Sequence, residues 1–264
     1  EMCIRDRRCS ACRRPLDTVG SQQDFHRQNV VATENLVAFC AGAGFPHIIY
    51  ISTSAVLYRE EHQVGMDEDT AIPGQFINEY ARTKYRGEEI MRRYCGPSTI
   101  LRPRAVFGPS DTVLFPRLLR AARRGTLPRI ETDQPVLGDL IYIDSLVDYI
   151  VKVATGRHTG LFQLTNNQPV LIAEFLTDIF RRLGVAPPTR TIKAASALRL
   201  ASVVETLWRL APFLGEPPIT RFGVGVMAYS KTFNVGKAIR VLGPPSVALE
   251  EGVARFIEWQ KPKM

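Results

Sequence analysis

The chain alternates between short apolar runs and longer amphipathic stretches, and this alternation restricts the fold more than any other feature. Apolar, β-rich runs predict strands at His47–Ile51 and at residues 98–102, 140–143 and 161–164. Apolar residues at helical spacing predict helices at residues 28–41, 76–94, 113–124, 145–155 and 172–183. Crossovers of this length join parallel strands. The sequence therefore predicts an α/β fold with a doubly wound, mainly parallel sheet covered by helices.

Two finer expectations accompany this pattern. The acidic segment at residues 60–70 is expected to be a polar loop, and Asp144 is expected to cap the helix that follows it. After Pro187-Pro188 the pattern changes to a helix over Ala194–Leu210, a strand over residues 231–235 and a closing helix over residues 247–260. We therefore expect a sheet domain over residues 15–165 and a smaller mixed region over residues 166–264, with an approximate boundary.

The first 14 residues, EMCIRDRRCSACRR, differ from the rest because they have no apolar period. We interpret residues 1–14 as a foreign leader on an N-terminally truncated gene product. The pair Cys9 and Cys12 forms a CxxC, but a structural zinc site needs a second pair and none follows. We therefore expect no metal site.

Composition excludes several classes of protein. Of 264 residues, 45% are hydrophobic and 23% are charged, which is typical of a globular chain and not of a disordered or fibrous one. The net charge of +8 is spread along the chain, so we expect no nucleic-acid partner. The longest apolar stretch, residues 194–214, carries Arg199, Glu205 and Arg209 and is a poor membrane span. With no signal peptide at its start, the chain is expected to be cytoplasmic.

The pair Tyr80 and Lys84 indicates chemistry. Both residues fall in one predicted helix, and a spacing of four places their side chains on the same face. A free phenol titrates near 10, and a nearby ammonium lowers that pKa because it favours tyrosinate. Such a pair can pass a proton to or from an alcohol or carbonyl oxygen.

Two further segments leave the carboxyl ends of predicted strands, where open α/β sheets hold their ligands. Tyr50-Ile-Ser-Thr-Ser-Ala-Val56 supplies hydroxyl groups that could donate to a substrate oxygen beside Tyr80. Leu101-Arg-Pro-Arg-Ala-Val-Phe-Gly-Pro109 follows the next strand.

The order of these segments resembles the extended short-chain dehydrogenase/reductases. That family has a strand ending in STS, then YxxxK on a helix, then LRPxxVFGP. Asn29-Val-Val-Ala-Thr-Glu-Asn-Leu36 is similar to its NVxGTxNL helix, and Asp139-Leu-Ile-Tyr-Ile-Asp144 to its DxxYVxD segment. Tyr229-Ser-Lys-Thr-Phe-Asn-Val235 is similar to its C-terminal segment. The resemblance implies an NAD(P)-binding Rossmann-type sheet and a small substrate-binding region.

Within the family, the chain most resembles the 3β-hydroxysteroid dehydrogenase-like proteins, on the run RPxxVFGPxD from Arg102 to Asp111. Nucleotide-sugar epimerases usually carry Asn where this chain has Ala105. The 4,6-dehydratases carry an acidic pair where this chain has Ser54-Ala55. The resemblance thus implies hydride transfer between nicotinamide and a secondary alcohol or ketone of an apolar substrate, either sterol-like or a long-chain β-keto or β-hydroxy acid.

The resemblance also assigns roles to residues. Thr53 corresponds to the catalytic hydroxyl, with Ser54 as the alternative if the loop is shifted by one residue. Tyr80 corresponds to the general acid/base, and Lys84 to the residue that lowers the Tyr80 pKa and binds the nicotinamide ribose. Asn29 is expected to hold its helix and an active-site water. Contacts with NAD or NADP are expected from the following residues: Ser52, Tyr80, Lys84, Pro103 and Val106.

The glycine-rich turn that holds the dinucleotide pyrophosphate in this family, GxxGxxG, has no counterpart in the sequence. The residue that selects NAD or NADP is missing with it. We expect about 70 residues of the family's usual first half to be absent, including the first strands of the sheet. We therefore expect this chain, produced alone, to aggregate or to bind the dinucleotide very weakly.

The helix at Ala194–Leu210 has three interpretations. Its apolar residues, with Pro212-Phe213-Leu214, can pack on the sheet domain, line a pocket for an apolar substrate or lie on a membrane surface. Membrane contact is the weakest of the three. The expected partner is a small apolar substrate, and the resemblance allows a homodimer through the helices that carry Asn29 and Tyr80.

Two alternatives to an oxidoreductase remain. One is a nucleotide-sugar epimerase of the same fold, against which Ala105 argues. The other is a non-catalytic dinucleotide sensor, although such sensors often lose the Tyr–Lys pair that this chain retains.

Overall fold

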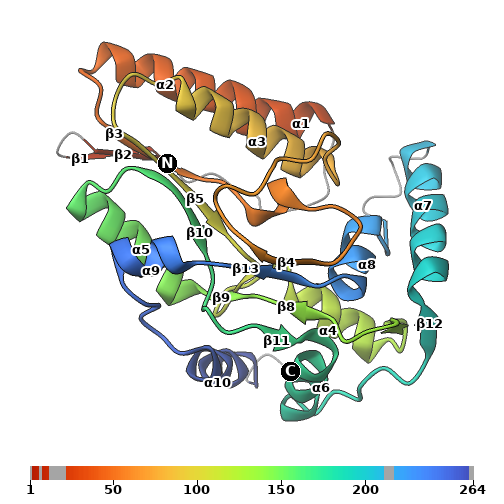
Figure 1. Ribbon diagram of the computed structural model, residues 1–264. Coiled ribbons are helices and arrows are strands. Elements are labelled where there is room, and N and C mark those ends of the chain that lie inside the picture. Colours follow the sequence, from red (N-terminus) through yellow and green to blue (C-terminus); the bar gives the residue numbers. More distant parts are fainter. Residues whose placement is uncertain (1, 6–7, 12–21, 211–216, 262–264) are drawn as a thin grey trace.

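The computed structural model describes residues 2–5, 8–11, 22–210 and 217–261. Figure 1 shows a central sheet between two layers of helices, with a second group of short strands and helices at one end. Apart from the terminal segments, the chain passes repeatedly from a strand to a helix and back, as the sequence pattern predicts.

The main sheet has five strands in the order β1-β2-β3-β5-β10. These are β1 (Met2–Arg5), β2 (Arg8–Ala11), β3 (His47–Ile51), β5 (Ser98–Pro103) and β10 (Gly160–Leu164). The last four run parallel to one another, and β1 is antiparallel to β2. β1 and β2 fall within the segment that we interpret as a leader, and β2 pairs with β3 at the edge of the sheet.

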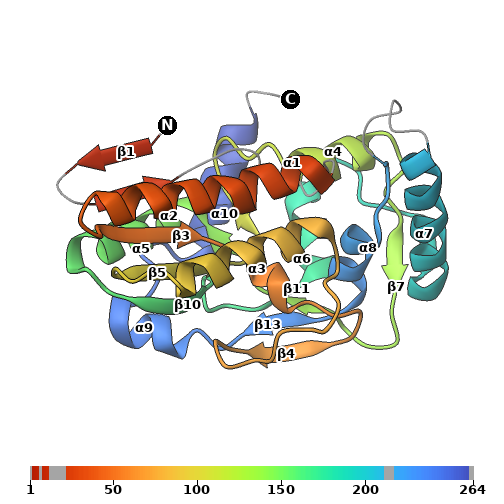
Figure 2. The same ribbon diagram turned by 90° about the horizontal axis from the view of Figure 1, so that it is seen from above.

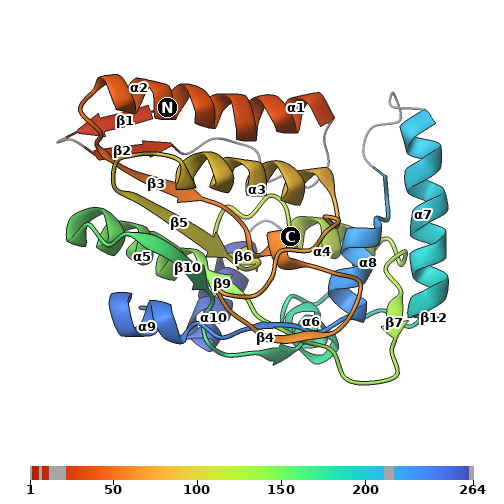
Figure 3. The same ribbon diagram turned by 45° about the horizontal axis from the view of Figure 1, so that its top comes forward.

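Helices cover both faces of this sheet (Figures 1 and 3). One face carries the continuous run of α1 (Gln22–His26), a π-helical turn (Arg27–Val31) and α2 (Ala32–Gly42), together with α3 (Glu79–Arg92). The other face carries α5 (Ile143–Gly156) and α9 (Gly236–Leu242). The Asn29 amide donates to the Thr83 hydroxyl at 3.0 Å, which joins the π-helical turn to α3.

Strand β3 shows why this layering forms. Successive side chains of a strand point to opposite faces. Ile48 and Tyr50 pack in a cluster with Leu36 of α2 and Met91 of α3. Ile49 packs on the opposite face, in a cluster with residues of α5. A strand with apolar side chains on both of its faces therefore needs a helix layer on each side.

A second group of elements forms the other end of the molecule. A four-stranded sheet has the order β11-β8-β13-β4 and is made by the following strands: β4 (Gln63–Met66), β8 (Leu137–Gly138), β11 (Val170–Leu171) and β13 (Lys231–Phe233). Two-stranded ladders join β6 (Val106–Phe107) to β9 (Ile141–Tyr142) and β7 (Arg129–Glu131) to β12 (Thr191–Lys193). The four-stranded sheet thus combines strands from both regions that we separate in sequence.

Five helices surround these short strands. They are α4 (Phe115–Arg123), α6 (Ile172–Arg182), α7 (Ala194–Leu210), α8 (Arg221–Ala228) and α10 (Leu249–Gln260). An aromatic core around Phe107, Phe115 and Phe256 joins α4, α6 and α10. Figure 2 shows α7 and β7 at the end of the molecule opposite β1.

The α/β fold class and the parallel sheet predicted from sequence are confirmed, and the predicted bounds of β3 and α7 match the structure. Two local predictions are wrong. The segment at residues 60–70 contains strand β4, because β13 pairs with it. Tyr142, not Asp144, occupies the N-cap of α5, and Asp144 lies within the first turn. Within the described ranges, no helix combines the length and apolar character needed to cross a membrane.

Candidate active site

Thr53 lies where strand β3 ends. The Ser52 amide still donates to the Leu101 carbonyl at 2.7 Å, which continues the β3–β5 pairing. Thr53 then caps a 3₁₀ turn (Ser54–Leu57), and its Oγ1 accepts from the Ala55 amide at 3.2 Å. Since the carboxyl ends of parallel strands meet at one edge of the sheet, Thr53 lies beside the end of β5.

Tyr80 faces Thr53 from the start of helix α3. The Asn78 side chain caps this helix by accepting from the Ala81 amide at 2.8 Å. Tyr80 is 6% exposed, and its phenol is hydrogen-bonded to Thr53. Burial raises the pKa of Tyr80 to about 12, and the Thr53 hydrogen bond opposes part of that rise. Tyr80 is therefore a protonated phenol at neutral pH.

Lys84 lies one turn further along α3. Its ammonium donates to the Ile51 carbonyl at 2.9 Å and lies 5.3 Å from the centre of the Tyr50 ring. Burial gives Tyr80 a raised net pKa, and the lowering of that pKa by Lys84 stays a prediction. Thr53 and Tyr80 are thus in contact, while Lys84 is held at the last residue of β3.

The alternative hydroxyl, Ser54, has a different partner. Its Oγ lies 3.2 Å from the Tyr58 hydroxyl and both groups are buried. Of the two hydroxyl groups considered in the sequence, the structure therefore places Thr53 against Tyr80.

Ser52 belongs to a buried charged network behind the site. Its hydroxyl donates to Glu88 Oε1 at 2.6 Å. Arg102, from β5, donates to both Glu88 oxygens at 2.8 and 2.6 Å. This network fixes the ends of β3 and β5 against α3. Sequence reasoning missed Glu88, although it lies four residues after Lys84 on the same helix.

The backbone turns sharply after strand β5. Pro103 is the last residue to pair with β10, and Val106 begins β6 by pairing with Ile141 of β9. Between them, Ala105 has a φ of 40°, in the left-handed region that few residues with a Cβ adopt. The two residues predicted to place backbone against nicotinamide, Pro103 and Val106, therefore lie at the same sheet edge as Thr53.

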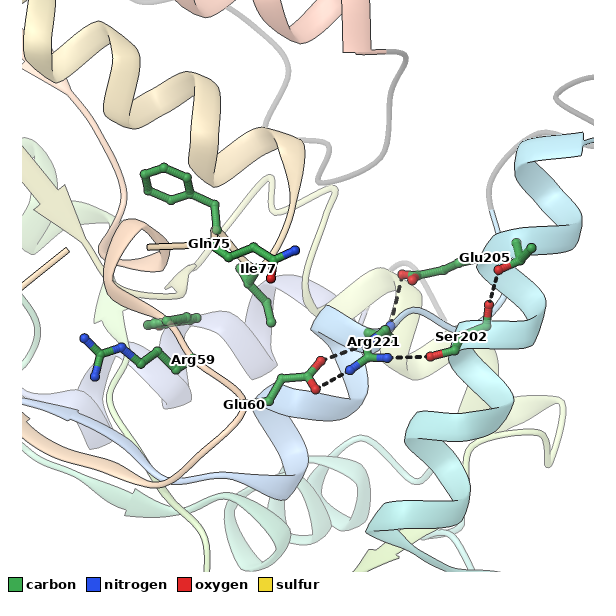
Figure 4. Close-up of a pocket in the computed structure, with 10 residues that line it drawn as sticks. Arg59, Glu60, Gln75, Ile77, Ser202, Glu205 and Arg221 are labelled. Atoms are coloured by element: carbon green, nitrogen blue, oxygen red, sulfur yellow. Dashed lines mark hydrogen bonds and ion pairs between the residues drawn. The ribbon is translucent and has the colours of Figure 1, made fainter. Parts of the chain in front are cut away.

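A pocket of about 600 Å³ lies between the segments at residues 58–60 and 75–77 and helices α7 and α8, and Thr53, Tyr80 and Lys84 are not among the residues that line it. Figure 4 shows the segment around Glu60 facing α7 and α8 across it. Arg221 joins the two sides, because it pairs with Glu60 and donates to the Ser202 hydroxyl at 2.7 Å. The pocket is lined by the following residues: Tyr58, Arg59, Glu60, Gln75, Phe76, Ile77, Ser202, Glu205, Thr206 and Arg221.

Helix α7 packs against its neighbours, and it also lines the pocket, with polar residues. Ala197 and Ala201 pack against Val224 of α8, while Ser202, Glu205 and Thr206 line the pocket. The pocket face of α7 is therefore polar, not apolar as expected. A row of apolar residues on α7 is exposed: Leu200, Val203, Leu207 and Leu210. Pro212-Phe213-Leu214 lies outside the described residues.

In the part of the chain that the structure describes, no group of three or more His, Cys, Asp or Glu side chains is placed to hold a metal ion. Cys12 of the CxxC lies outside that part.

The side chains at the strand edge fit one half of a dinucleotide. Hydroxyl and ammonium groups from Thr53, Tyr80 and Lys84 suit the hydroxyl-rich nicotinamide ribose. The phenol also suits a reacting oxygen beside that ring. For the pyrophosphate half, the sequence contains no GxxGxxG turn.

The fold is a Rossmann-type sheet, with hydroxyl and ammonium groups from Thr53, Tyr80 and Lys84 at its strand ends. Residues 11–163 match the model of the NAD dependent epimerase/dehydratase family. The chain belongs to this family.

Two curated relatives are similar along most of the chain. It is 31% identical to a 2-alkyl-3-oxoalkanoate reductase of Stenotrophomonas maltophilia, over 90% of this chain and 75% of that protein. It is 29% identical to a 3beta-hydroxysteroid-dehydrogenase/decarboxylase, isoform 2, of Arabidopsis thaliana. That match covers 92% of this chain and 46% of the plant protein, so the chain spans less than half of this relative.

Solved structures share the fold. A dTDP-glucose 4,6-dehydratase of Streptomyces venezuelae, solved with NAD and TYD bound, superposes with a TM-score of 0.68 at 19% identity. The match covers 96% of this chain and 71% of that one. At this identity the likeness establishes the architecture alone.

Proposed function

We propose that the protein is an NAD(P)-dependent oxidoreductase that transfers hydride between nicotinamide and a secondary alcohol or ketone of a substrate with an apolar body. The single observation that carries the proposal is the hydrogen-bonded pair of Tyr80 and Thr53 at the end of β3. The pocket against α7 includes Phe76 and Ile77, which come just before α3, the helix that carries Tyr80.

The proton chemistry follows from the residues. A bound NAD(P)H supplies hydride, and the chain must protonate the oxygen that results. Tyr80, with a pKa of about 12, carries its proton at neutral pH and donates it to a carbonyl oxygen. Thr53 orients that oxygen by hydrogen bonding. Ketone reduction uses this protonated phenol directly, whereas alcohol oxidation requires the phenol to lose its proton first.

For the substrate we propose a long-chain 3-oxo acid, with a sterol-like 3-hydroxy acid as the second class. Support comes from the printed activities of the relatives, a 2-alkyl-3-oxoalkanoate reductase and a 3beta-hydroxysteroid-dehydrogenase/decarboxylase.

The test compares two phenol-to-phenyl variants on helix α3, at a dinucleotide concentration high enough to offset the weak binding expected without a GxxGxxG turn. We expect Tyr80→Phe to lower kcat for 3-oxodecanoate reduction about 10²–10⁴-fold, the usual contribution of a positioned general acid. Tyr85→Phe, on the same helix, is the control and should retain activity. The absorbance of NADH and of NADPH follows both reactions. Full activity of Tyr80→Phe would refute the assignment and favour a dinucleotide-sensing protein.

The nucleotide-sugar epimerase remains a second candidate, because solved structures of such enzymes share the fold. One example is a UDP-glucuronic acid 4-epimerase of Bacillus cereus, with a TM-score of 0.66 at 19% identity. A thermal-shift screen separates the two candidates. Stabilisation by UDP-glucuronic acid, with none by a 3-hydroxy acid, would favour the epimerase.

A further inference from the structure

Two buried cations stand beside the candidate active site. Arg104 follows directly after strand β5 and is 6% exposed, and Lys231, in strand β13, is 2% exposed. Both lie over the Tyr58 ring, at 5.1 Å for the Arg104 guanidinium and 5.5 Å for the Lys231 ammonium. A buried positive charge is unfavourable unless a negative group or several acceptors compensate it.

Protein groups compensate these charges only in part. Lys231 donates to the carbonyls of Arg59 and Glu61. Arg104 forms no ion pair and no side-chain hydrogen bond with the described residues, and its buried Nε has no partner. Asp139 is buried nearby, and its Oδ2 accepts from the Phe233 amide. Two cations therefore face one carboxylate that does not contact either of them within ion-pair distance.

Electrostatics indicate the same excess of positive charge. Burial and the Arg104 charge lower the pKa of Lys231 to about 8, against a weaker opposing effect of Glu61. Burial raises the pKa of Asp139 to about 6, and Arg104 only partly offsets this rise. An anion placed against Arg104 would offset the lowered pKa of Lys231, whereas it would add to the raised pKa of Asp139.

Tyr58 and Ser54 connect the uncompensated cation to the reacting groups. Tyr58, over which Arg104 lies, forms part of the pocket wall. The Tyr58 hydroxyl also contacts Ser54, the neighbour of Thr53. The path from the unpaired guanidinium to the Thr53–Tyr80 pair therefore passes through one aromatic ring and one turn.

We propose that Arg104 is a specificity-determining residue that binds a carboxylate of the substrate, so that the site selects a 3-oxo acid over its neutral ester. This inference rests on the proposed function and deepens it. The bond is a charge-assisted hydrogen bond to a planar guanidinium, for which a carboxylate has matching geometry.

Kinetics test the selection with 3-oxodecanoate and its methyl ester. We expect the wild-type kcat/KM for the acid to exceed that for the ester by roughly ten- to a hundredfold. Arg104→Met should remove this ratio by raising KM for the acid, with kcat little changed. Arg104→Lys should restore part of the ratio. Arg59→Met, an exposed arginine in the same pocket wall, is the control and should leave it unchanged.

A binding measurement separates the failure of this inference from failure of the proposed function. Melting of the unmodified 264-residue chain is followed with 3-hydroxydecanoate and with its methyl ester, which requires no turnover. We expect 3-hydroxydecanoate, but not its methyl ester, to raise the melting temperature of the wild type. Neither ligand should raise the melting temperature of Arg104→Met. Equal shifts by acid and ester would overturn the role of Arg104, whatever the reductase assay shows. A merely structural Arg104 would instead lower the melting temperature when replaced and leave the acid-to-ester ratio unchanged.

Discussion

Arg102 and Arg104 are two residues apart at the end of strand β5, and both are buried, yet their surroundings differ. Arg102 forms a two-pronged pair with Glu88, which also accepts from Ser52. Arg104 has no ion pair among the described residues and lies over an aromatic ring of the pocket wall. The comparison teaches that burial alone does not indicate a role. The paired charge of Arg102 holds two strands to a helix, and we propose that the unpaired charge of Arg104 binds an anionic substrate group.

The largest expected effect is on the free energy of unfolding, when the paired arginine Arg102 is replaced. Arg102→Met leaves buried Glu88 with only Arg92 and Ser52 as partners, and breaking a buried pair in this way lowers stability by about 3–5 kcal/mol. Urea unfolding at neutral pH measures the change, with Arg104→Met as the matched variant. We expect Arg104→Met to be neutral or stabilising. Equal losses in both variants would remove the distinction between the two arginines.

A smaller effect concerns the carboxylate near Arg104. Asp139 has a pKa of about 6, above the usual 3.8, because burial disfavours its charged form. The folded protein therefore holds this proton more tightly than the unfolded chain does. The contribution of Asp139 to stability falls as pH rises from about 4 to about 6 and stays lost above that, by at most about 3 kcal/mol.

The Asp139→Asn variant isolates this contribution. Urea unfolding of the wild type and the variant at pH values below 4 and at pH 7 should show the variant gaining stability relative to the wild type at the higher pH. A difference between the two proteins that is independent of pH would mean that Arg104 already compensates Asp139, contrary to the comparison above.

The smallest effect tests how α3 presents its residues to the site. Asn78→Ala removes the side chain that caps α3 and should lower stability by about 1 kcal/mol. Because the cap precedes Tyr80 by two residues, we also expect a modest loss of kcat. Asn78→Asp is the control, since an aspartate caps equally well. A loss of activity in both variants, with stability unchanged, would assign Asn78 a direct role instead.

Much of the fold can be predicted from the sequence, because buried strands such as His47–Ile51 and helices such as Ala194–Leu210 carry their periodicity locally. The strand β4 could not be predicted, since a polar, half-exposed segment becomes a strand only when β13 pairs with it. The N-cap of α5 was mispredicted because local capping rules favour Asp144, while the pairing of β9 places Tyr142 at that position.

The candidate site divides in the same way. Tyr80, Lys84 and Thr53 stand in local motifs, so their positions at the end of β3 could be anticipated. The direction of the Tyr80 pKa could not, because it depends on burial by distant segments. The proximity of Arg104 and Lys231 could not be predicted either, because 127 positions separate them in the sequence. They meet at the Tyr58 ring only because β13 packs near the end of β5.

The proposed function depends on hydride transfer to the carbonyl carbon C3 of a 3-oxo acid beside Thr53 and Tyr80. The most direct measurement is mass spectrometry of the product formed from 3-oxodecanoate with nicotinamide cofactor deuterated at both hydrogens of C4. We predict 3-hydroxydecanoate carrying a single deuterium at C3, formed by the wild type and about 10²–10⁴-fold more slowly by Tyr80→Phe. Product without deuterium, or labelled product formed equally fast by both proteins, would contradict the account.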